Sequence, residues 1–381
     1  MNLDQLDTPA IILAQSRLAR NTAAMTARAK ELGVDLRPHL KTAKSADVAR
    51  SALDGNFGGI TVATLVEAEY FFDNGFPDMT YAACIVPSKL DRVAALNAKG
   101  ADLKLITDNA GVARAIAEHG GPHKVLIEID CGEHRTGVPP DARELLEIAA
   151  ILDTAETAEL EGVLTHAGHS YSRRTPDEFA AVAEEERASV VMAAERIRGA
   201  GHPCPTVSAG STPCVMFARD ATGLREVRPG VYMFGDMFHA GLGTRKIDEI
   251  AITVLASVIA HRRDDNQLYI DAGGLALSKD RATAAFEGDA DIGYGLVCEV
   301  TTARPIPGLK VAEVHQEHGL VTAANKDSPL PFDDLPIGAR IRVMPNHVCM
   351  TVAAYDAYNV IESEAETGTE IIATWGRCNG W

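Results

Sequence analysis

Residues 125–166 decide the fold of this chain. They begin with the apolar run VLIEID (125–130), continue with a helical stretch (Ala142–Asp153) and end with a second apolar run, GVLTH (162–166). Two short buried strands joined by an amphipathic helix form a βαβ unit, and parallel strands need a crossover of this kind. The stretch therefore predicts a parallel sheet covered by helices.

The same alternation extends along the chain in both directions. A helix is predicted after Ser16, which is expected to be its N-cap. Further helices are predicted at 65–74, 90–99, 109–119 and 176–199, and further strands at 36–41, 59–64, 79–84, 103–107, 206–208 and 227–234. Eight strands alternating with helices predict an α/β fold, a (β/α)8 TIM barrel over residues 10–243. The competing doubly wound sheet would have a G-x-G-x-x-G motif after its first strand, and the sequence has none there.

After Gly243 the pattern changes to short strand-like runs separated by Gly, Pro, Asp and Asn. Such runs lie at 250–260, 268–271, 309–315, 319–323, 339–343, 358–361 and 370–373. Helix signals are few in this half of the sequence. We therefore predict a second, all-β domain formed by residues 244–381 together with residues 1–9.

Composition narrows the class of protein. The 381 residues are enough for two domains, and 46% hydrophobic with 23% charged residues is typical of a globular enzyme. A net charge of −17 argues against nucleic acid as a partner, although a local pocket can still bind an anion. No apolar run approaches the roughly 20 residues of a membrane helix, and no signal peptide is evident. Seven scattered cysteines, an odd number, indicate reduced thiols and a cytoplasmic protein.

The segment Pro345-Asn346-His347-Val348-Cys349 contains two soft metal ligands two residues apart. On an extended strand His347 and Cys349 would point to the same face. An imidazole and a thiolate suit zinc, and two protein ligands leave positions open for water or substrate. Cysteine is also often a small buried apolar residue. The pair gains weight as a metal site because a second reactive segment exists near the N-terminus.

That second segment is Arg37-Pro38-His39-Leu40-Lys41-Thr42-Ala43-Lys44, at the end of the first predicted barrel strand. In such barrels the chemistry lies at the carboxyl ends of the strands. A lysine at the mouth of an apolar barrel is costly unless it is used or paired, and burial would lower its pKa and make it a better nucleophile or base. The alternative is an ordinary surface lysine.

Other polar clusters follow successive predicted strands. They are CGEHRTG (131–137), THAGHSY (165–171), SAGSTP (208–213) and VRPGVY (227–232). Small Gly/Ser/Thr turns after the seventh and eighth strands are where barrels of this kind commonly hold phosphate. Together these clusters predict a phosphorylated cofactor with a lysine beside it.

Several motifs, in this order, resemble those of the metal-dependent branch of the fold-type III pyridoxal-phosphate enzymes. They are DTPA (7–10), RPHLKT (37–42), GHSY (168–171), GSTP (210–213), QEHG (316–319) and PNHVC (345–349). The branch includes the D-serine dehydratases of eukaryotic type, D-threo-3-hydroxyaspartate dehydratase and the D-threonine aldolases. The resemblance spans nearly the whole chain and implies an alanine racemase-like barrel.

The resemblance also implies a role for individual residues. Lys41 would bind pyridoxal 5'-phosphate covalently, with Lys44 as the alternative, and Tyr171 would lie close to metal and substrate. The remaining cofactor contacts implied are Arg135 near the phenolic oxygen, His166 on the pyridine face, Gly210, Ser211, Thr212, Gly230 and Val231 at the phosphate, and Arg228 at the pyridine nitrogen.

For the metal, the resemblance implies His347 and Cys349 as ligands. The ion expected is zinc, with manganese, cobalt or nickel as alternatives. D-threonine aldolases usually have Asp where this chain has Cys349, which favours the dehydratases. Gln316 and His318 are expected to line the substrate pocket, and the family is homodimeric.

The activity implied is elimination of water from a D-β-hydroxy amino acid, with release of a 2-oxo acid and ammonia. D-Serine and D-threo-3-hydroxyaspartate are both open as substrates, and the latter needs a cation for its second carboxylate. The candidates are Arg173, Arg174, Lys279 and Arg281. The alternative activities are retro-aldol cleavage, which yields glycine and an aldehyde, and a non-catalytic pyridoxal-phosphate carrier.

Overall fold

The computed structural model describes residues 1–286, 288–325, 328–362 and 368–381. These residues divide into two compact units. The barrel unit consists of Ala23–Gly230 and Cys378–Trp381, and the sheet unit consists of Met1–Thr22 and Val231–Arg377. Each unit contains one sheet among its described residues.

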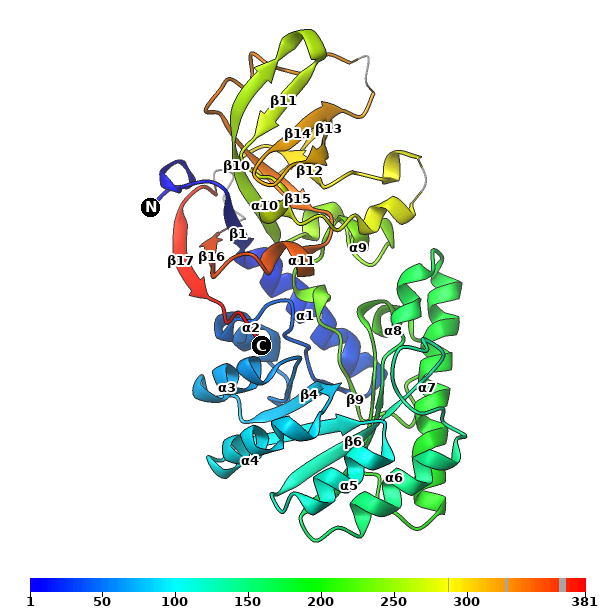
Figure 1. Cartoon of the computed structure of the whole chain (residues 1–381). Coiled ribbons are helices and arrows are strands. Elements are labelled where there is room, and N and C mark those ends of the chain that lie inside the picture. The colour runs from blue at the N-terminus through cyan, green and yellow to red at the C-terminus, as the bar shows by residue number, and fades with distance from the viewer. Residues whose placement is uncertain (287, 326–327, 363–367) are drawn as a thin grey trace. The chain divides into compact units, whose positions relative to one another are not determined.

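The barrel unit is built on one curled sheet of parallel strands (Figure 1). Its described strands, in spatial order, are β2 (Asp35–Leu36), β9 (Glu226–Val227), β8 (Thr206–Ala209), β7 (Ala158–Thr165), β6 (His123–Ile129), β5 (Asp102–Thr107), β4 (Asp78–Cys84) and β3 (Ile60–Val62). A parallel bridge between His39 and Thr61 joins the two ends of this order. There Thr61 N–H donates to the Pro38 carbonyl and Leu40 N–H donates to the Thr61 carbonyl, each over 2.9 Å. The predicted (β/α)8 barrel is confirmed.

The helices of the barrel unit cover the outer face of the strands (Figure 1). They are α2 (Ala46–Leu53), α3 (Leu65–Asp73), α4 (Leu90–Ala98), α5 (Ala110–Glu118), α6 (Arg143–Asp153), α7 (Pro176–Gly199) and α8 (Thr212–Phe217). The longest, α7, begins at a capping box in which Thr175 accepts from Glu178 N–H and the Glu178 carboxylate accepts from Thr175 N–H. The sequence did not predict α2 and α8. Helix α1 (Gln15–Leu32) begins one residue before Ser16, so the predicted N-cap is wrong.

The strand that leads to Lys41 is fixed by a buried ion network. Arg37 donates to the Glu226 carboxylate over 2.7 Å and to the Asp78 carboxylate over 2.8 Å. The Arg37 and Glu226 side chains are only 5% and 3% exposed. Losing one partner of such a buried pair would leave an uncompensated charge, so the network holds this end of the strand in place.

The sheet unit contains a mixed sheet in which nine strands are described. In spatial order they are β11 (Gln267–Ile270), β14 (Gly319–Ala323), β13 (Pro305–Val314), β12 (Gly295–Cys298), β15 (Arg340–Pro345), β10 (Ile252–Arg262), β1 (Ala10–Ala14), β16 (Ala357–Ile361) and β17 (Ile371–Gly376). Its short helices are α9 (Met237–Gly241), α10 (Gly274–Leu277) and α11 (Val348–Val352). The prediction that this half of the chain forms a β domain is confirmed, but strand β12 was not predicted.

Strand β1 lies between β10, to which it is antiparallel, and β16, to which it is parallel. The predicted boundary at residue 10 assigned it to the barrel, and the structure places it in the sheet unit instead. The physical reason is that all five residues of β1 are buried. A strand with apolar residues throughout fits the middle of a sheet covered on both faces.

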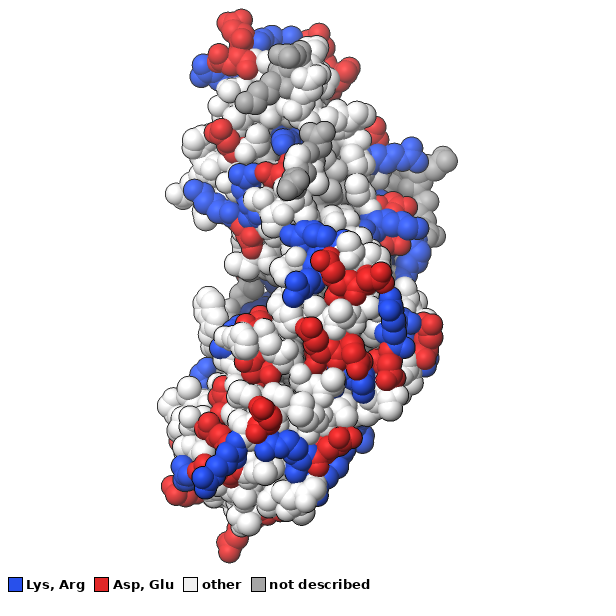
Figure 2. Space-filling view, turned by 90° about the vertical axis from the view of Figure 1, so that its right-hand side faces the viewer, with Lys and Arg blue, Asp and Glu red and all other residues white. Residues whose placement is uncertain are grey.

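The surface carries charges of both signs. On the face drawn in Figure 2, basic and acidic side chains alternate over short distances. Within the described ranges, no helix has the length and apolar character needed to cross a membrane.

Candidate active site

Lys41 and Lys44 follow the first barrel strand and differ in their surroundings. Lys44 forms an ion pair of 3.2 Å with Glu67, whose side chain is 1% exposed. Lys41 lies in the turn after Leu40 and is exposed. Lys41 is therefore not buried, and its role as nucleophile or base stays a prediction. Lys41 is the more accessible amine of the two.

Cationic side chains surround two imidazoles in the barrel unit. Burial, followed by the charges of Lys41, Arg135 and Arg228, lowers the pKa of His166 to about 3. Burial, followed by the charges of Lys41 and Arg228, lowers the pKa of His39 well below its usual value. Both rings are therefore neutral near pH 7. Lys41, Arg135 and Arg228, which the sequence singled out, thus act on His166 at one end of the barrel. The net positive charge of this group suits an anionic ligand.

Arg228 is 6% exposed and lies inside the barrel. Its guanidinium donates to the Ser208 hydroxyl and, over 2.5 Å, to the Thr165 carbonyl. Burial lowers the pKa of Arg228, while Glu226, Glu186 and Glu128 counteract that effect. These contacts hold the guanidinium in one position against the neighbouring strands β7 and β8.

The turn after β8 has the geometry of an anion cradle. Gly210 has a φ of 103°, which favours glycine, and Ser211 accepts from the Cys214 N–H over 3.2 Å at the start of α8. Thr212 is 1% exposed, and its hydroxyl has no hydrogen-bond partner among the residues that the structure describes. A buried hydroxyl without a hydrogen-bond partner costs free energy unless a ligand supplies that partner. A phosphate oxygen would supply it here.

Gly230 and Val231 lie at the boundary between the two units. A Cβ atom on Gly230 would come within 2.6 Å of the His39 carbonyl oxygen, so only glycine fits there. Val231 is 7% exposed and begins a short 3-10 helix (Val231–Met233) in place of the second half of the predicted eighth strand.

The loop after β6 is fixed by carboxylates, and Arg135 projects from it. The Asp130 carboxylate accepts from Gly132 and His134 N–H groups over 2.9 and 3.0 Å. Glu133 accepts from Gly168 N–H over 3.0 Å and pairs with Arg135 at 3.3 Å. The Arg135 side chain is 57% exposed, so it remains accessible to a ligand.

Tyr171 lies in a 3-10 helix, η3 (Gly168–Ser172), that follows β7. Its carbonyl accepts from Arg174 over 3.1 Å, and the residue is half-buried. The same bond engages the Arg174 guanidinium, which makes Arg174 a weaker candidate for binding a substrate carboxylate.

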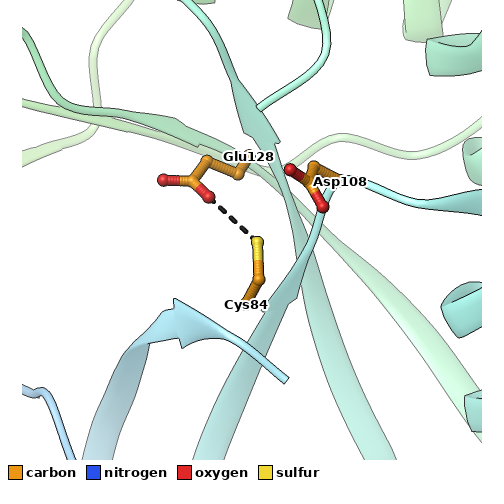
Figure 3. A group of neighbouring side chains, drawn as sticks. All are labelled: Cys84, Asp108 and Glu128. Atoms are coloured by element: carbon orange, nitrogen blue, oxygen red, sulfur yellow. Dashed lines mark hydrogen bonds between the residues drawn. The ribbon is translucent and has the colours of Figure 1, made fainter. Parts of the chain in front are cut away.

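Cys84, Asp108 and Glu128 form a group that was not predicted from the sequence, and they come from the ends of β4, β5 and β6 (Figure 3). The Cys84 thiol donates to the Glu128 carboxylate over 3.0 Å. Burial, followed by Glu128 and Asp108, raises the pKa of Cys84, so the thiol stays protonated. Glu128, an acidic residue between apolar neighbours in the run VLIEID, was the signal of this group in the sequence.

His347 and Cys349 lie in the sheet unit, where β15 ends and α11 begins. The predicted extended strand is wrong here, because His347 is extended while Cys349 is already in the first turn of α11. Their side chains nevertheless lie close enough to interact. Burial lowers the pKa of His347, but Cys349, Asp236 and Asp280 outweigh it and raise the pKa to about 10. An imidazole and a thiol in contact, surrounded by negative charge, form a donor pair that suits a divalent cation.

Gln316 and His318 are exposed in the hairpin between β13 and β14. This hairpin contacts the start of α10, where Gly274 N–H donates to the His315 carbonyl over 2.7 Å and Leu275 N–H to the Gln316 carbonyl over 3.1 Å. Arg281 follows α10 in the sequence. Its guanidinium pairs with the Asp291 carboxylate and lies over the Tyr294 ring. Arg281 is therefore engaged by side chains of its own unit.

Two protein families match the chain. The family described as "Alanine racemase, N-terminal domain" matches residues 13–237, and "Putative serine dehydratase domain" matches residues 251–361. The D-threo-3-hydroxyaspartate dehydratase of Delftia sp. (strain HT23) is 43% identical over 99% of this chain and 98% of its own length. The D-serine dehydratase of Dictyostelium discoideum is 30% identical over 95% of both chains.

Solved structures show the same similarity to the dehydratases. The structure of the Delftia enzyme matches with a TM-score of 0.95 and 42% identity over the whole of both chains. Two D-threo-3-hydroxyaspartate dehydratase variants also match, one with a cysteine and one with a histidine replaced by alanine at positions two residues apart, and the cysteine variant is in the metal-free form. A D-threonine aldolase of Arthrobacter sp. is more distant, at 28% identity over 94% of this chain and 90% of its own. The chain belongs to the fold-type III pyridoxal-phosphate enzymes, in the branch of the D-serine and D-threo-3-hydroxyaspartate dehydratases.

Proposed function

We propose that this protein is a pyridoxal-phosphate- and metal-dependent dehydratase, a carbon–oxygen lyase that acts on D-β-hydroxy amino acids. The observation that carries the proposal is the contact between His347 and Cys349 in a chain similar over nearly its full length to two dehydratases. The cysteine and histidine replaced in the D-threo-3-hydroxyaspartate dehydratase variants have the same spacing as this pair. The aldolases are more distant, so retro-aldol cleavage is the weaker alternative.

The barrel unit would hold the cofactor. Lys41 would bind it covalently, Ser211 and Thr212 with the backbone of Gly210, Gly230 and Val231 would hold its phosphate, and Arg135, His166 and Arg228 would contact its ring. Pyridoxal phosphate, when bound, supplies an electron sink for charge that develops at Cα. The orphaned Thr212 hydroxyl and the surrounding cations support this assignment.

The sheet unit would hold the metal through His347 and Cys349. A divalent ion supplies a Lewis acid for a β-hydroxyl group, which is a poor leaving group by itself. We propose zinc, because an imidazole and a thiolate suit it best, with manganese, cobalt or nickel as alternatives.

Lys41 would also act as the general base. Its amine can take the Cα proton from one face, so one enantiomer presents that proton correctly. Both dehydratases to which the chain is similar are named for D-amino acids. We therefore propose the D enantiomer, loss of the hydroxyl group as water, and hydrolysis to a 2-oxo acid and ammonia. Tyr171, Gln316 and His318 would contact the substrate.

The test of this function is turnover on a panel of D- and L-β-hydroxy amino acids, with cofactor and zinc or manganese supplied. We expect pyruvate from D-serine, oxaloacetate from D-threo-3-hydroxyaspartate, or both, each with one equivalent of ammonia. The L enantiomers should give neither. Glycine and an aldehyde without ammonia would instead indicate an aldolase, and the absence of any product would contradict an enzymatic role.

Three further properties are proposed on the same basis. The protein would be cytoplasmic and homodimeric, with a barrel domain that ends near residue 243 and a β domain formed by residues 244–381 together with the N-terminal segment that contains β1. The two matching families, which end and begin near these boundaries, support the division. A light-scattering mass equal to one chain would contradict the dimer.

Thr212→Val tests the phosphate contact. We expect the dissociation constant for pyridoxal phosphate to rise roughly tenfold or more, since a hydrogen bond to a charged group contributes about 1.5–3 kcal/mol. Absorbance titration of the cofactor-free protein measures it. Thr61→Val is the matched control, because Thr61 is also buried and its hydroxyl also has no partner among the described residues. Equal affinities in the two variants would contradict the assignment of Thr212.

A further inference from the structure

The segment that contains His347 and Cys349 is held by polar side chains from distant parts of the sheet unit. Asn346 is fully buried at its start. Its side-chain amide donates to the Thr283 hydroxyl over 2.6 Å and to the Gly293 carbonyl over 2.5 Å, and its oxygen accepts from Thr283 N–H over 3.1 Å. These bonds tie the end of β15 to the segment that follows Asp280.

The backbone between His347 and Cys349 is held by a second buried group. Val348 N–H donates to one oxygen of the Asp236 carboxylate over 2.9 Å. The other oxygen lies 2.8 Å from the backbone nitrogen of His239, which donates to it, and 2.9 Å from the Nδ1 of the same residue. Asp236 is fully buried, so this carboxylate fixes the first turn of α11 and with it the position of Cys349.

The imidazole of His347 is oriented by a third group. Its Nδ1 lies 2.6 Å from an oxygen of the Asp280 carboxylate. The two side chains are 28% and 35% exposed, so neither is locked by burial alone. Because Nδ1 is engaged by Asp280, Nε2 is the nitrogen left to bind a cation.

We propose that Asp280 is a positioning residue for the metal site. It holds His347 in the tautomer and direction in which Nε2 faces an ion bound together with Cys349. The inference rests on the proposed metal site and extends it to a residue that does not itself bind the ion. Carboxylates that orient a metal-binding histidine in this way typically change metal affinity by about 10–100-fold when they are replaced.

The test is the zinc dissociation constant of the full chain with pyridoxal phosphate bound, measured by competition with a chromophoric chelator. We expect Asp280→Ala to bind zinc about 10–100-fold more weakly than the unchanged protein. Asp280→Asn should recover part of this loss, because its amide oxygen can still accept from Nδ1. Asp333→Asn is the matched control, since Asp333 is an exposed carboxylate of the same unit that pairs with Arg263 at 2.7 Å. It should bind zinc normally.

Two outcomes separate this inference from the proposed function. If Asp280→Ala binds zinc as tightly as the control while His347→Ala binds none, the role of Asp280 is wrong and the metal site stands. If His347→Ala keeps one zinc with unchanged affinity, the metal site is wrong and the role of Asp280 fails with it. Circular dichroism and the cofactor absorbance establish that each variant is folded. A loss of zinc affinity in a folded Asp280→Ala variant, partly restored in Asp280→Asn, supports the inference.

Discussion

We expect the Lys41→Ala variant to lose both the visible absorbance of bound pyridoxal phosphate and its turnover. The amine of Lys41 would provide the covalent bond to the cofactor and the base for the Cα proton, so one substitution removes two functions. Loss of a positioned base alone typically costs roughly 10²–10⁴-fold in rate. Absorbance spectra and single-substrate assays of purified protein measure both effects.

Lys44→Ala is the matched control for this experiment. Lys44 is three residues further along the chain, and its amine pairs with the buried Glu67 carboxylate. Its replacement should cost stability and leave the cofactor absorbance in place. A Lys41→Ala variant with an unchanged spectrum, or a Lys44→Ala variant without one, would move the covalent attachment away from Lys41.

His347→Ala should have the second large effect, a loss of bound metal together with a fall in turnover of roughly a thousandfold or more. The reason is that Lewis-acid stabilisation is worth several kcal/mol, and each step of about 1.4 kcal/mol is a factor of ten. The cofactor absorbance should remain, because all the proposed cofactor contacts except Val231 lie in the barrel unit. Metal content by mass spectrometry and turnover with added zinc measure the result.

His261→Ala serves as the control for His347→Ala. His261 belongs to the same unit, and its ring nitrogen lies 2.8 Å from the Leu335 carbonyl oxygen. This variant should keep both metal and turnover. Removal of the ion from the unchanged protein with a chelator should reproduce the His347→Ala phenotype, and readdition of zinc should reverse it. Full activity without metal would contradict the metal assignment.

The barrel could be predicted because its strands are short apolar runs that end in turns. The runs VLIEID and GVLTH correspond to β6 and β7, which are parallel neighbours with paired residues such as Ile127 and Val163. Helix α8 was missed because its residues, TPCVMF, are too few to show a helical period. Strand β12 was missed because its pairing with β13 and β15 is a tertiary effect that a four-residue run does not reveal.

The candidate site was only partly accessible from the sequence. The spacing of His347 and Cys349 singled them out as a pair, and their side chains are in contact, but the strand geometry invoked for them was wrong. The first turn of α11 is held at Val348 by Asp236, a residue more than one hundred positions earlier in the chain. The same limit applies to Asp280 and to the Cys84 group, whose members meet only when β4, β5 and β6 are adjacent.

The position of β1 affects the order in which the polypeptide can fold as it leaves the ribosome. Domains generally fold as units during synthesis, and the barrel unit is nearly complete once residue 230 has emerged. Strand β1 is made before the barrel strands, yet its parallel neighbour β16 ends at Ile361. Strand β1 can therefore be paired on one side at most until β16 has been translated.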